Sequence, residues 1–228
     1  MNIYAISDLH LSINNPKPMN IFGQVWDNYL DDIENSLKCA CDDDIVLLAG
    51  DLSWAMTLEQ AAPDLAYIGK YPGHKVIIRG NHDYWWKSIS AVRAALPEKV
   101  YAVQNDCVKI GDVVIGGSRG WSLDDRTEEG KKIFARELIR IEMSLQAMQK
   151  MRGEGDRAVF MIHYPPFNAR LEASSVTALF EKYGISAVIY GHLHGKDCRS
   201  KPVLNKNGID YYLTSCDQVQ NRAVKIEI

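Results

Sequence analysis

The sequence predicts an α/β fold in which two mixed β-sheets lie face to face and are covered by helices. Five short apolar segments, at residues 3–7, 45–50, 76–79, 159–162 and 187–190, each run directly into polar residues. Segments with helical periodicity separate most of them, as expected for parallel strands joined by crossovers. Shorter apolar segments joined by turn residues, in the middle and at the end of the chain, predict additional antiparallel strands.

The first half of the chain alternates between predicted strands and helices. Residues 11–22 contain Asn and Pro and are expected to form a loop after the first strand. Apolar residues at steps of three and four then predict an amphipathic helix over residues 22–41. A second helix is predicted over residues 57–71, with Thr57 as its N-cap, and a third over residues 87–96, ended by Pro97.

The second half begins with three short apolar segments, at residues 100–103, 107–110 and 113–117, which predict antiparallel strands. The longest helix is predicted over residues 126–152, and a further one over residues 174–183. The long helix has one apolar stripe, which we interpret as core packing: Ile133, Phe134, Leu138, Ile141, Leu145 and Met148. Residues 202–204, 209–215 and 223–228 predict a β-meander with a hairpin turn at residues 205–208. We expect one domain over residues 1–228.

Composition narrows the class of protein. Of the 228 residues 46% are hydrophobic and 24% charged, which is ordinary for a globular protein. The net charge of -3 and the lack of a basic run make a dedicated nucleic-acid or membrane surface unexpected. The chain enters a strand at once with no signal segment, so a cytoplasmic protein is expected. Five cysteines without disulfide or metal-site spacing are expected to be reduced.

Polar residues of ligand type gather where the predicted strands end. Five of the six histidines lie there, namely His10, His82, His163, His192 and His194, and Asp8, Asp51 and Asn81 occupy equivalent positions. In an α/β sheet such positions face the crevice that binds ligands. A single histidine there is more often structural, but five such coincidences favour a common site. The glycines at positions 50, 80, 191 and 195 are either turn residues or allow close approach of the backbone.

The residue types indicate a metal site. Asp, His and Asn without Cys suit divalent manganese, iron, zinc or nickel. Residues two apart in an extended segment face the same side, so both members of Asp8/His10 and of His192/His194 can reach one cavity. A carboxylate such as Asp51 can bridge two metal ions, and a two-metal site suits in-line phosphoryl displacement.

The motifs, taken in order, resemble the signature of the calcineurin-like metallophosphoesterases. They are Asp8-x-His10, Gly50-Asp51, Gly80-Asn81-His82-Asp83, His163 and Gly191-His192-Leu193-His194. The resemblance implies a four-layer αββα sandwich, the metallo-dependent phosphatase fold. It also implies that Asp8, His10 and His194 bind one divalent metal ion, that Asn81, His163 and His192 bind a second, and that Asp51 bridges them. A metal-bridging hydroxide would attack phosphorus, and His82 would stabilise the transition state or protonate the leaving oxygen.

The sequence departs from the protein Ser/Thr phosphatase branch of that superfamily. In that branch the Gly-Asp motif continues as GDxxDRG, but Trp54 and Ala55 stand here in place of its second Asp and its Arg. The orienting partner of His82 is therefore unassigned, and Asp83 is adjacent only in sequence. Arg119 is a candidate replacement for the phosphate-binding arginine, or else an ordinary exposed loop residue.

Aromatic residues near the ligand motifs suggest a small substrate. Most are expected to pack in the core, but Trp54, Tyr84 and Trp121 are candidates for a wall that stacks on a nucleobase or aryl group. We therefore expect a metal-dependent phosphohydrolase that acts on a small phosphodiester or nucleotide-like substrate. The alternatives are a phosphomonoesterase (including a protein phosphatase), a nuclease of the same superfamily, and a non-catalytic metal-binding scaffold. The oligomeric state is not predicted.

Overall fold

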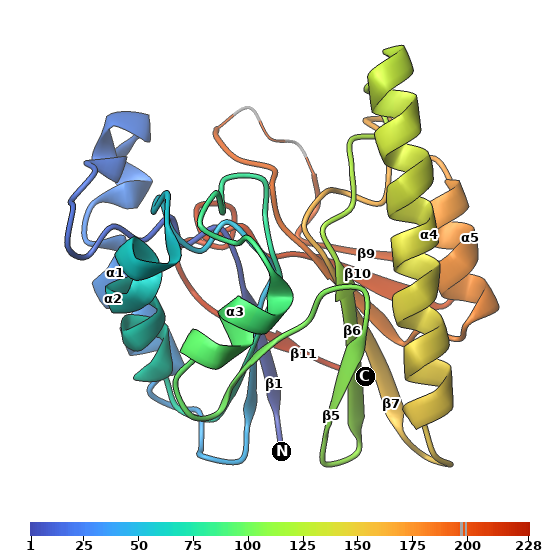
Figure 1. The fold of residues 1–228 in the computed structure, drawn as a ribbon, viewed down its shortest axis with the longest axis horizontal. Helices are drawn as coiled ribbons and strands as arrows, with labels where there is room; N and C mark the ends of the chain where they lie inside the picture. The colour runs from blue at the N-terminus through green and yellow to red at the C-terminus, as the bar shows by residue number, and fades with distance from the viewer. Residues whose placement is uncertain (197, 199) are drawn as a thin grey trace.

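The protein has four layers in the order helix, sheet, sheet, helix (Figure 1). The computed structural model describes residues 1–196, 198 and 200–228. Helices α1 (Tyr29–Leu37), α2 (Leu58–Gly69) and α3 (Ile89–Ala95) cover one sheet. Helices α4 (Glu128–Met151) and α5 (Ser175–Lys182) cover the other. The predicted α/β sandwich of two mixed sheets is confirmed.

The first sheet has the strand order β11-β1-β2-β3-β4. Its strands are β1 (Ile3–Ile6), β2 (Ile45–Leu48), β3 (His74–Ile77), β4 (Val100–Ala102) and β11 (Val224–Ile226). Strands β1 to β4 are parallel, and only β11 at the edge runs antiparallel to its neighbour. The carboxyl ends of β1, β2 and β3 therefore lie side by side.

The second sheet has the order β5-β6-β7-β8-β10-β9. Its strands are β5 (Cys107–Ile110), β6 (Val113–Ser118), β7 (Arg157–Ile162), β8 (Ala187–Tyr190), β9 (Val203–Lys206) and β10 (Ile209–Leu213). The four central strands are parallel, and hairpins add the antiparallel edge strands β5 and β9. The predicted hairpin turn at residues 205–208 is confirmed.

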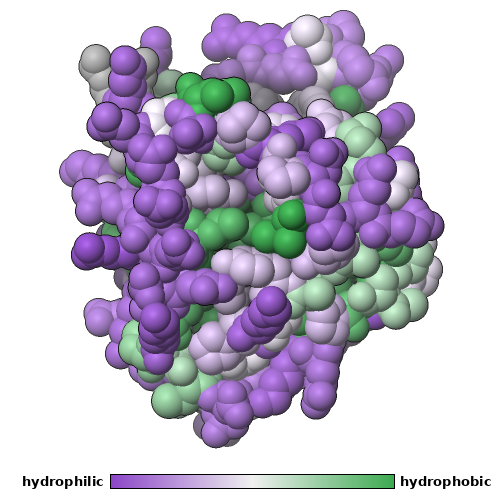
Figure 2. All heavy atoms as spheres, turned by 90° about the vertical axis from the view of Figure 1, so that its left-hand side faces the viewer, coloured by the Kyte–Doolittle hydropathy of each residue, from purple (hydrophilic) through white to green (hydrophobic). Residues whose placement is uncertain are grey.

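Three apolar cores hold the layers together. The central core lies between the sheets and includes Leu47, Val76 and Val159, all fully buried. One outer core joins the first sheet to α1–α3, and the other joins the second sheet to α4 and α5. Because the inner strands are covered on both faces, they are continuously apolar rather than alternating. Figure 2 shows the side of the molecule that carries α1 and α2, where hydrophilic side chains surround scattered hydrophobic ones.

Five of the six residues in the predicted stripe of the long helix pack in the core, whereas Ile133 is half-buried and belongs to none of the described clusters. Ile141, Leu145 and Met148 of α4 are buried in the outer core of the second sheet, and Phe134 and Leu138 pack against it. The predicted N-cap is also present, since the Thr57 side chain accepts a hydrogen bond from the backbone of Gln60. Comparable caps begin α3, α4 and α5, at Ser88, Thr127 and Ser174.

The helix predicted over residues 22–41 is wrong in its first part. Only Tyr29–Leu37 is α-helical, and two 3₁₀ turns, η1 (Met19–Phe22) and η2 (Gln24–Trp26), precede it. Gly23 (φ 128°) and Asn28 (φ 54°) have positive φ angles, which interrupt a right-handed helix. Phe22 is 63% exposed, so the apolar stripe does not extend to that end.

Two strand-pairing predictions are also wrong. The strand predicted at residues 100–103 is parallel to β3, because α3 connects them as a crossover. The last strands are no meander. β10 pairs in parallel with β8, and β11 crosses to the first sheet to pair with β1. Residues 214–223 make that crossing, and they bring a carboxylate, Asp217, to the strand ends described below.

All five cysteines are free thiols, as expected. Within the described ranges, no helix combines the length and the apolar character that crossing a membrane requires.

Candidate metal centre

The predicted ligand residues converge at the carboxyl ends of five parallel strands. They follow β1, β2, β3, β7 and β8, which belong to both sheets and meet at one edge of the sandwich. The structure brings all seven together with His82: Asp8, His10, Asp51, Asn81, His163, His192 and His194. Sequence positions as distant as 8 and 194 thus form one site.

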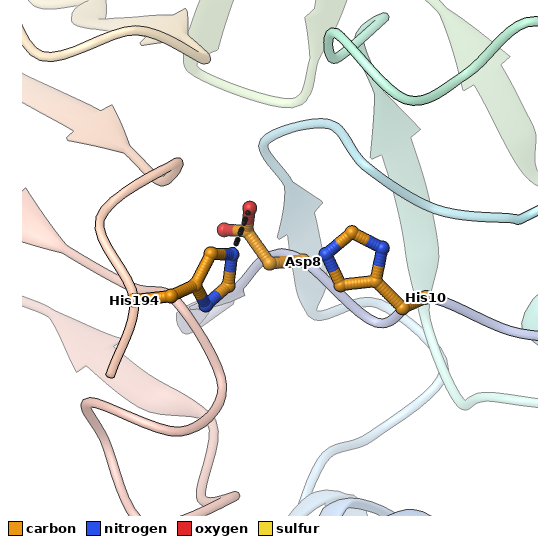
Figure 3. A group of neighbouring side chains, drawn as sticks. All are labelled: Asp8, His10 and His194. Carbon is orange, nitrogen blue, oxygen red and sulfur yellow. Dashed lines mark hydrogen bonds and ion pairs between the residues drawn. The ribbon is translucent and has the colours of Figure 1, made fainter. Parts of the chain in front are cut away.

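Asp8 is the centre of one group of ligands. Its Oδ1 lies 3.0 Å from Nε2 of His194, and Figure 3 shows the carboxylate between His194 and His10. The backbone N–H of His192 donates to both carboxylate oxygens at 3.1 Å, and the Ser7 hydroxyl donates to Oδ2 at 2.6 Å. The carboxylate is fully buried. These donors hold it in one orientation.

Asp51 lies between the two groups of histidines. Its Oδ2 is 3.9 Å from Nε2 of His10 and 3.4 Å from Nε2 of His163. Its Oδ1 accepts a hydrogen bond from the backbone N–H of His82 at 2.7 Å. Ligand atoms of Asp8, His10 and His194 lie within 4.8 Å of one another, and so do those of Asp8, Asp51 and His163. Asp51 is therefore placed to contact ions bound on both sides of it.

Asn81 joins the remaining two histidines. Its Oδ1 lies 2.7 Å from Nε2 of His163 and 2.8 Å from Nδ1 of His192. The other ring nitrogen of His163 faces the carbonyl oxygen of Ala49 at 3.0 Å. A carbonyl can only accept, so Nδ1 of His163 carries a proton, and the lone pair of the neutral ring lies on Nε2. That lone pair points at the oxygens of Asn81 and Asp51.

This arrangement fits a bound cation. In the neutral form of His163, the Nε2 lone pair faces the oxygens of Asn81 and Asp51, and a bound cation can take the place of the proton that these acceptors attract. Nδ1 of His10 is buried and has no hydrogen-bond partner among the described residues, which leaves it unused by the protein. The donor set of Asp, Asn and His without Cys suits a divalent metal of borderline to hard character. The residues present therefore fit the metal ions that the motifs imply.

Burial and the neighbouring charges shift the pKa values of the candidate ligands in different directions. Burial opposes a positive charge on His163, but the carboxylates of Asp51 and Asp8 raise its pKa to about 9. Burial likewise opposes ionisation of Asp51, yet the charge and hydrogen bond of His163 lower its pKa. Burial is the main cause at His10 and His192 and lowers the pKa of each to about 4, which keeps these rings neutral. Neutral histidines and ionised carboxylates are the forms that bind metals, so a metal ion that binds His163 must displace the proton that the neighbouring carboxylates favour there.

Four of the ligands have unusual backbone conformations. Asp8, His10, Asp51 and His192 have φ angles of 60°, 47°, 51° and 71°. The left-handed region is rarely occupied by residues other than glycine, and it is typical of functional sites where the surrounding structure compensates the strain. In this protein, each of these turns directs a side chain toward the candidate metal centre at the carboxyl ends of the strands.

Three glycines allow the backbone to approach the ligands. A Cβ atom on Gly80 would collide with Oδ1 of Asp51, and one on Gly191 would collide with Oδ2 of Asp8. A Cβ on Gly50, which has φ 92°, would lie 2.8 Å from Nδ1 of His163. Among the residues that the structure describes, none lies within 4 Å of the equivalent position on Gly195. The first three glycines are therefore required for close approach, whereas Gly195 only forms a turn.

The comparisons with known proteins decide the family. The profile of the family described as calcineurin-like phosphoesterase matches residues 1–196. The chain belongs to this family. No curated protein sequence matches it.

Two solved structures show the fold of this calcineurin-like phosphoesterase. A phosphopantetheinyl hydrolase from Mycobacterium tuberculosis is similar with a TM-score of 0.61 and 14% sequence identity, over 99% of this chain and 95% of the other. A protein of unknown function from Aquifex aeolicus is similar with a TM-score of 0.50 and 18% identity, over 98% of this chain and 95% of the other. At these identities the likeness concerns the fold alone.

Asp83 does not orient His82. Its carboxylate is fully buried and accepts hydrogen bonds from the backbone N–H groups of Leu52, Ser53 and Gly80. Burial and the charge of Asp51 raise the pKa of Asp83 to about 6. Its function is to tie the Gly-Asp loop to the following motif. The ring of His82 has no hydrogen-bond partner among the described residues and is held by aromatic contacts.

The four candidate substrate residues fall into two groups. Trp54 stacks on His10 with ring centroids 4.7 Å apart and lies 4.9 Å from His82. Tyr84 is 44% exposed and lies 6.2 Å from His82. Trp54 and Tyr84 therefore flank the candidate proton donor.

The other two candidates lie on the opposite sheet. The guanidinium of Arg119 lies 5.0 Å over the ring of Trp121 and 4.0 Å from the carboxylate of Glu137. Trp121 packs 5.5 Å from Tyr164, the residue after His163. Trp121 contacts the site through Tyr164, so the four candidates form two separate groups on the two sheets. Trp85 and Trp86, which follow Tyr84 in the sequence, are buried core residues.

Asp217 was not anticipated. Its Oδ1 lies 2.8 Å from Nδ1 of His194, and its Oδ2 accepts a hydrogen bond from the backbone of Gly195 at 2.7 Å. Burial opposes ionisation, but the hydrogen bond from His194 lowers the pKa of Asp217. A carboxylate on the far nitrogen fixes the tautomer and orientation of a metal-binding histidine. The sequence signal was available, because Asp217 also follows a strand, β10.

The close approach at Gly50 yields a prediction with a matched control. Gly50→Ala introduces both left-handed strain and a collision with Gly80 and His163, whereas Gly155→Ala introduces strain alone at φ 81° in open space. We expect both variants to lose about 1 kcal/mol of stability from strain. Only Gly50→Ala should weaken manganese binding, by about 10–100-fold. Isothermal titration calorimetry measures this, and equal affinities in the two variants would contradict the role of Gly50.

The contact of Asp217 yields a second prediction. Asp217→Ala should weaken manganese binding by about 10–100-fold, because His194 loses the carboxylate that orients it. Asp210→Ala, in β10, is the control that removes a carboxylate away from the site. Equilibrium dialysis followed by metal analysis measures both. Unchanged affinity in Asp217→Ala would show that His194 needs no such partner.

Proposed function

We propose that this protein is a dinuclear-metal-dependent phosphohydrolase that acts on a small phosphodiester. The observation that carries the proposal is the convergence of six candidate ligand side chains around Asp51, with His82 beside them. Family membership supports phosphoester chemistry, because calcineurin-like phosphoesterases are typically metal-dependent hydrolases.

Two groups of residues would hold the metal ions. Asp8, His10 and His194 form one set of donors, Asn81, His163 and His192 form the other, and Asp51 contributes to both. When bound, such ions activate water and neutralise charge on a phosphoryl group. Manganese, iron, zinc and nickel all suit these donors.

His82 is placed to serve the leaving group. In the hydrolysis of a diester, the oxygen of water forms a bond to phosphorus and the bond from phosphorus to the leaving oxygen breaks. We assign to His82 the donation of a proton to the leaving oxygen; of the two protons of water, one restores His82 and the other passes to solvent. The contacts of its ring with Trp54 and His10 hold it at the mouth of the site. Its backbone N–H, bonded to Asp51, fixes the loop.

The preference for a diester rests on what stands in place of the phosphatase arginine. Trp54 and Ala55 supply no positive charge to bind a dianionic monoester, and Trp54 packs on His10. Arg119 is held by Glu137 and Trp121, and so it is a weaker candidate for that role. A nuclease is disfavoured by the net charge of -3. A non-catalytic scaffold is disfavoured because the complete ligand set and His82 are present.

Hydrolysis of bis-p-nitrophenyl phosphate and p-nitrophenyl phosphate tests the proposal. Metal-stripped protein should be inactive, and manganese should restore turnover with the diester preferred. His82→Ala should lower kcat by about 10²–10⁴-fold with manganese still bound, whereas Asp51→Asn should lose metal binding as well. His74→Ala is the matched control, because His74 lies at the opposite end of β3 and contacts Tyr101. Preference for the monoester would favour a phosphatase, and no turnover of either substrate would contradict the proposal.

A further inference from the structure

A cavity of about 610 Å³ opens beside the metal centre. Two of the predicted ligands, His192 and His194, line one side of it. The volume lies within the range of small-molecule sites. One part of the remaining lining is apolar and comes from the end of β8 and the loops after β6, β7 and β8: Leu123, Tyr164, Phe167, Leu171, Tyr190 and Leu193. Polar side chains, among them Ser122, Asp124, Asn168 and Ser200, complete the lining.

Two aromatic side chains of the apolar wall pack against neighbouring rings. The ring of Tyr164 lies 4.3 Å from that of His192, so the wall begins directly at a metal ligand. Phe167 is 5% exposed and packs edge-on against Tyr211 at 4.6 Å, which anchors it to the second sheet. Such a surface gains free energy by binding an apolar group, at roughly 25 cal/mol for each Å² buried.

The cavity and His82 lie on different sides of the metal centre. The described residues that line the cavity include neither His82 nor its neighbours His10, Trp54 and Tyr84. Those neighbours surround His82 at centroid distances of 5.6, 4.9 and 6.2 Å. A leaving oxygen that receives a proton from His82 is therefore directed away from the cavity.

We propose that the cavity binds the ester group that stays on phosphorus, and that this group is an uncharged, apolar organic substituent. The inference rests on the proposed function and specifies its substrate. The preferred substrate is then an unsymmetrical diester: a small alcohol leaves at His82, and the monoester of an apolar alcohol remains in the cavity as product. A phosphomonoester has no second substituent to fill the cavity, which gives a physical reason for diester preference.

Two substrates that differ only in the retained group test this proposal. These are methyl p-nitrophenyl phosphate and 2-phenylethyl p-nitrophenyl phosphate, with p-nitrophenol release followed in the manganese-loaded enzyme. Both retained groups are alkyl, so the intrinsic reactivity at phosphorus is similar. We expect kcat/KM to be about 10–100-fold higher for the 2-phenylethyl ester, because its ring is buried in the cavity.

A variant that fills the cavity shows which substituent it holds. Ala169 lines the cavity yet is exposed, so Ala169→Trp adds bulk there without disturbing the core. It should abolish the kcat/KM advantage of the 2-phenylethyl ester over the methyl ester. Ala94→Trp, on the exposed face of α3, is the matched control and should leave that advantage unchanged. Equal loss with both substrates in Ala169→Trp would show that the cavity holds the leaving group, which overturns the inference.

A measurement on the unmodified protein is independent of any variant. The product 2-phenylethyl phosphate should inhibit at least about tenfold more tightly than methyl phosphate. Equal inhibition together with equal kcat/KM for the two diesters overturns the inference but leaves the proposed phosphohydrolase intact. Absence of turnover with both diesters, with metal bound, overturns the proposed function and the inference together.

Discussion

The arrangement of the site depends on the burial of two carboxylates, Asp8 and Asp51. Their exposed fractions are 0% and 1%, and an ionised group so deeply buried is costly unless positive charge or hydrogen-bond donors surround it. Backbone N–H groups of His82 and His192 supply part of that compensation. The remainder must come from protons or cations. Bound metal ions would provide this compensation, because the candidate ligand groups are already in place.

The backbone conformation allows these charged groups to lie close together. Parallel strands from both sheets end at one edge, left-handed turns at Asp8 and Asp51 direct the carboxylates inward, and glycines at positions 80 and 191 leave room for them. Asp83 and Asp217 add a second layer of carboxylates, which tie loops and hold His194. Strain in the turns is thus compensated by hydrogen bonds that only the folded edge can provide.

The sequence predicted the two mixed sheets and the gathering of the candidate ligands at one edge, because apolar runs that end in ligand-type residues indicate where strands end. It did not predict how the strand at residues 100–103 pairs, since the residue pattern of a short apolar strand is the same whether its neighbour is parallel or antiparallel. It also placed the last strands in one meander, because local turn signals cannot show that residues 214–223 cross between sheets. Asp217 was missed for the same reason. The division between the His82 side and the cavity side depends on side-chain packing, as at Trp54 and Tyr164, which sequence spacing does not specify.

The most direct test of the account is the number and position of metal ions in the protein loaded with manganese. Crystals soaked in manganese, with anomalous diffraction used to locate the ions, give both quantities. The account predicts two ions per chain, one beside Asp8, His10 and His194, the other beside Asn81, His163 and His192, with Asp51 in contact with both. A single ion, or ions bound away from Asp51, would contradict it.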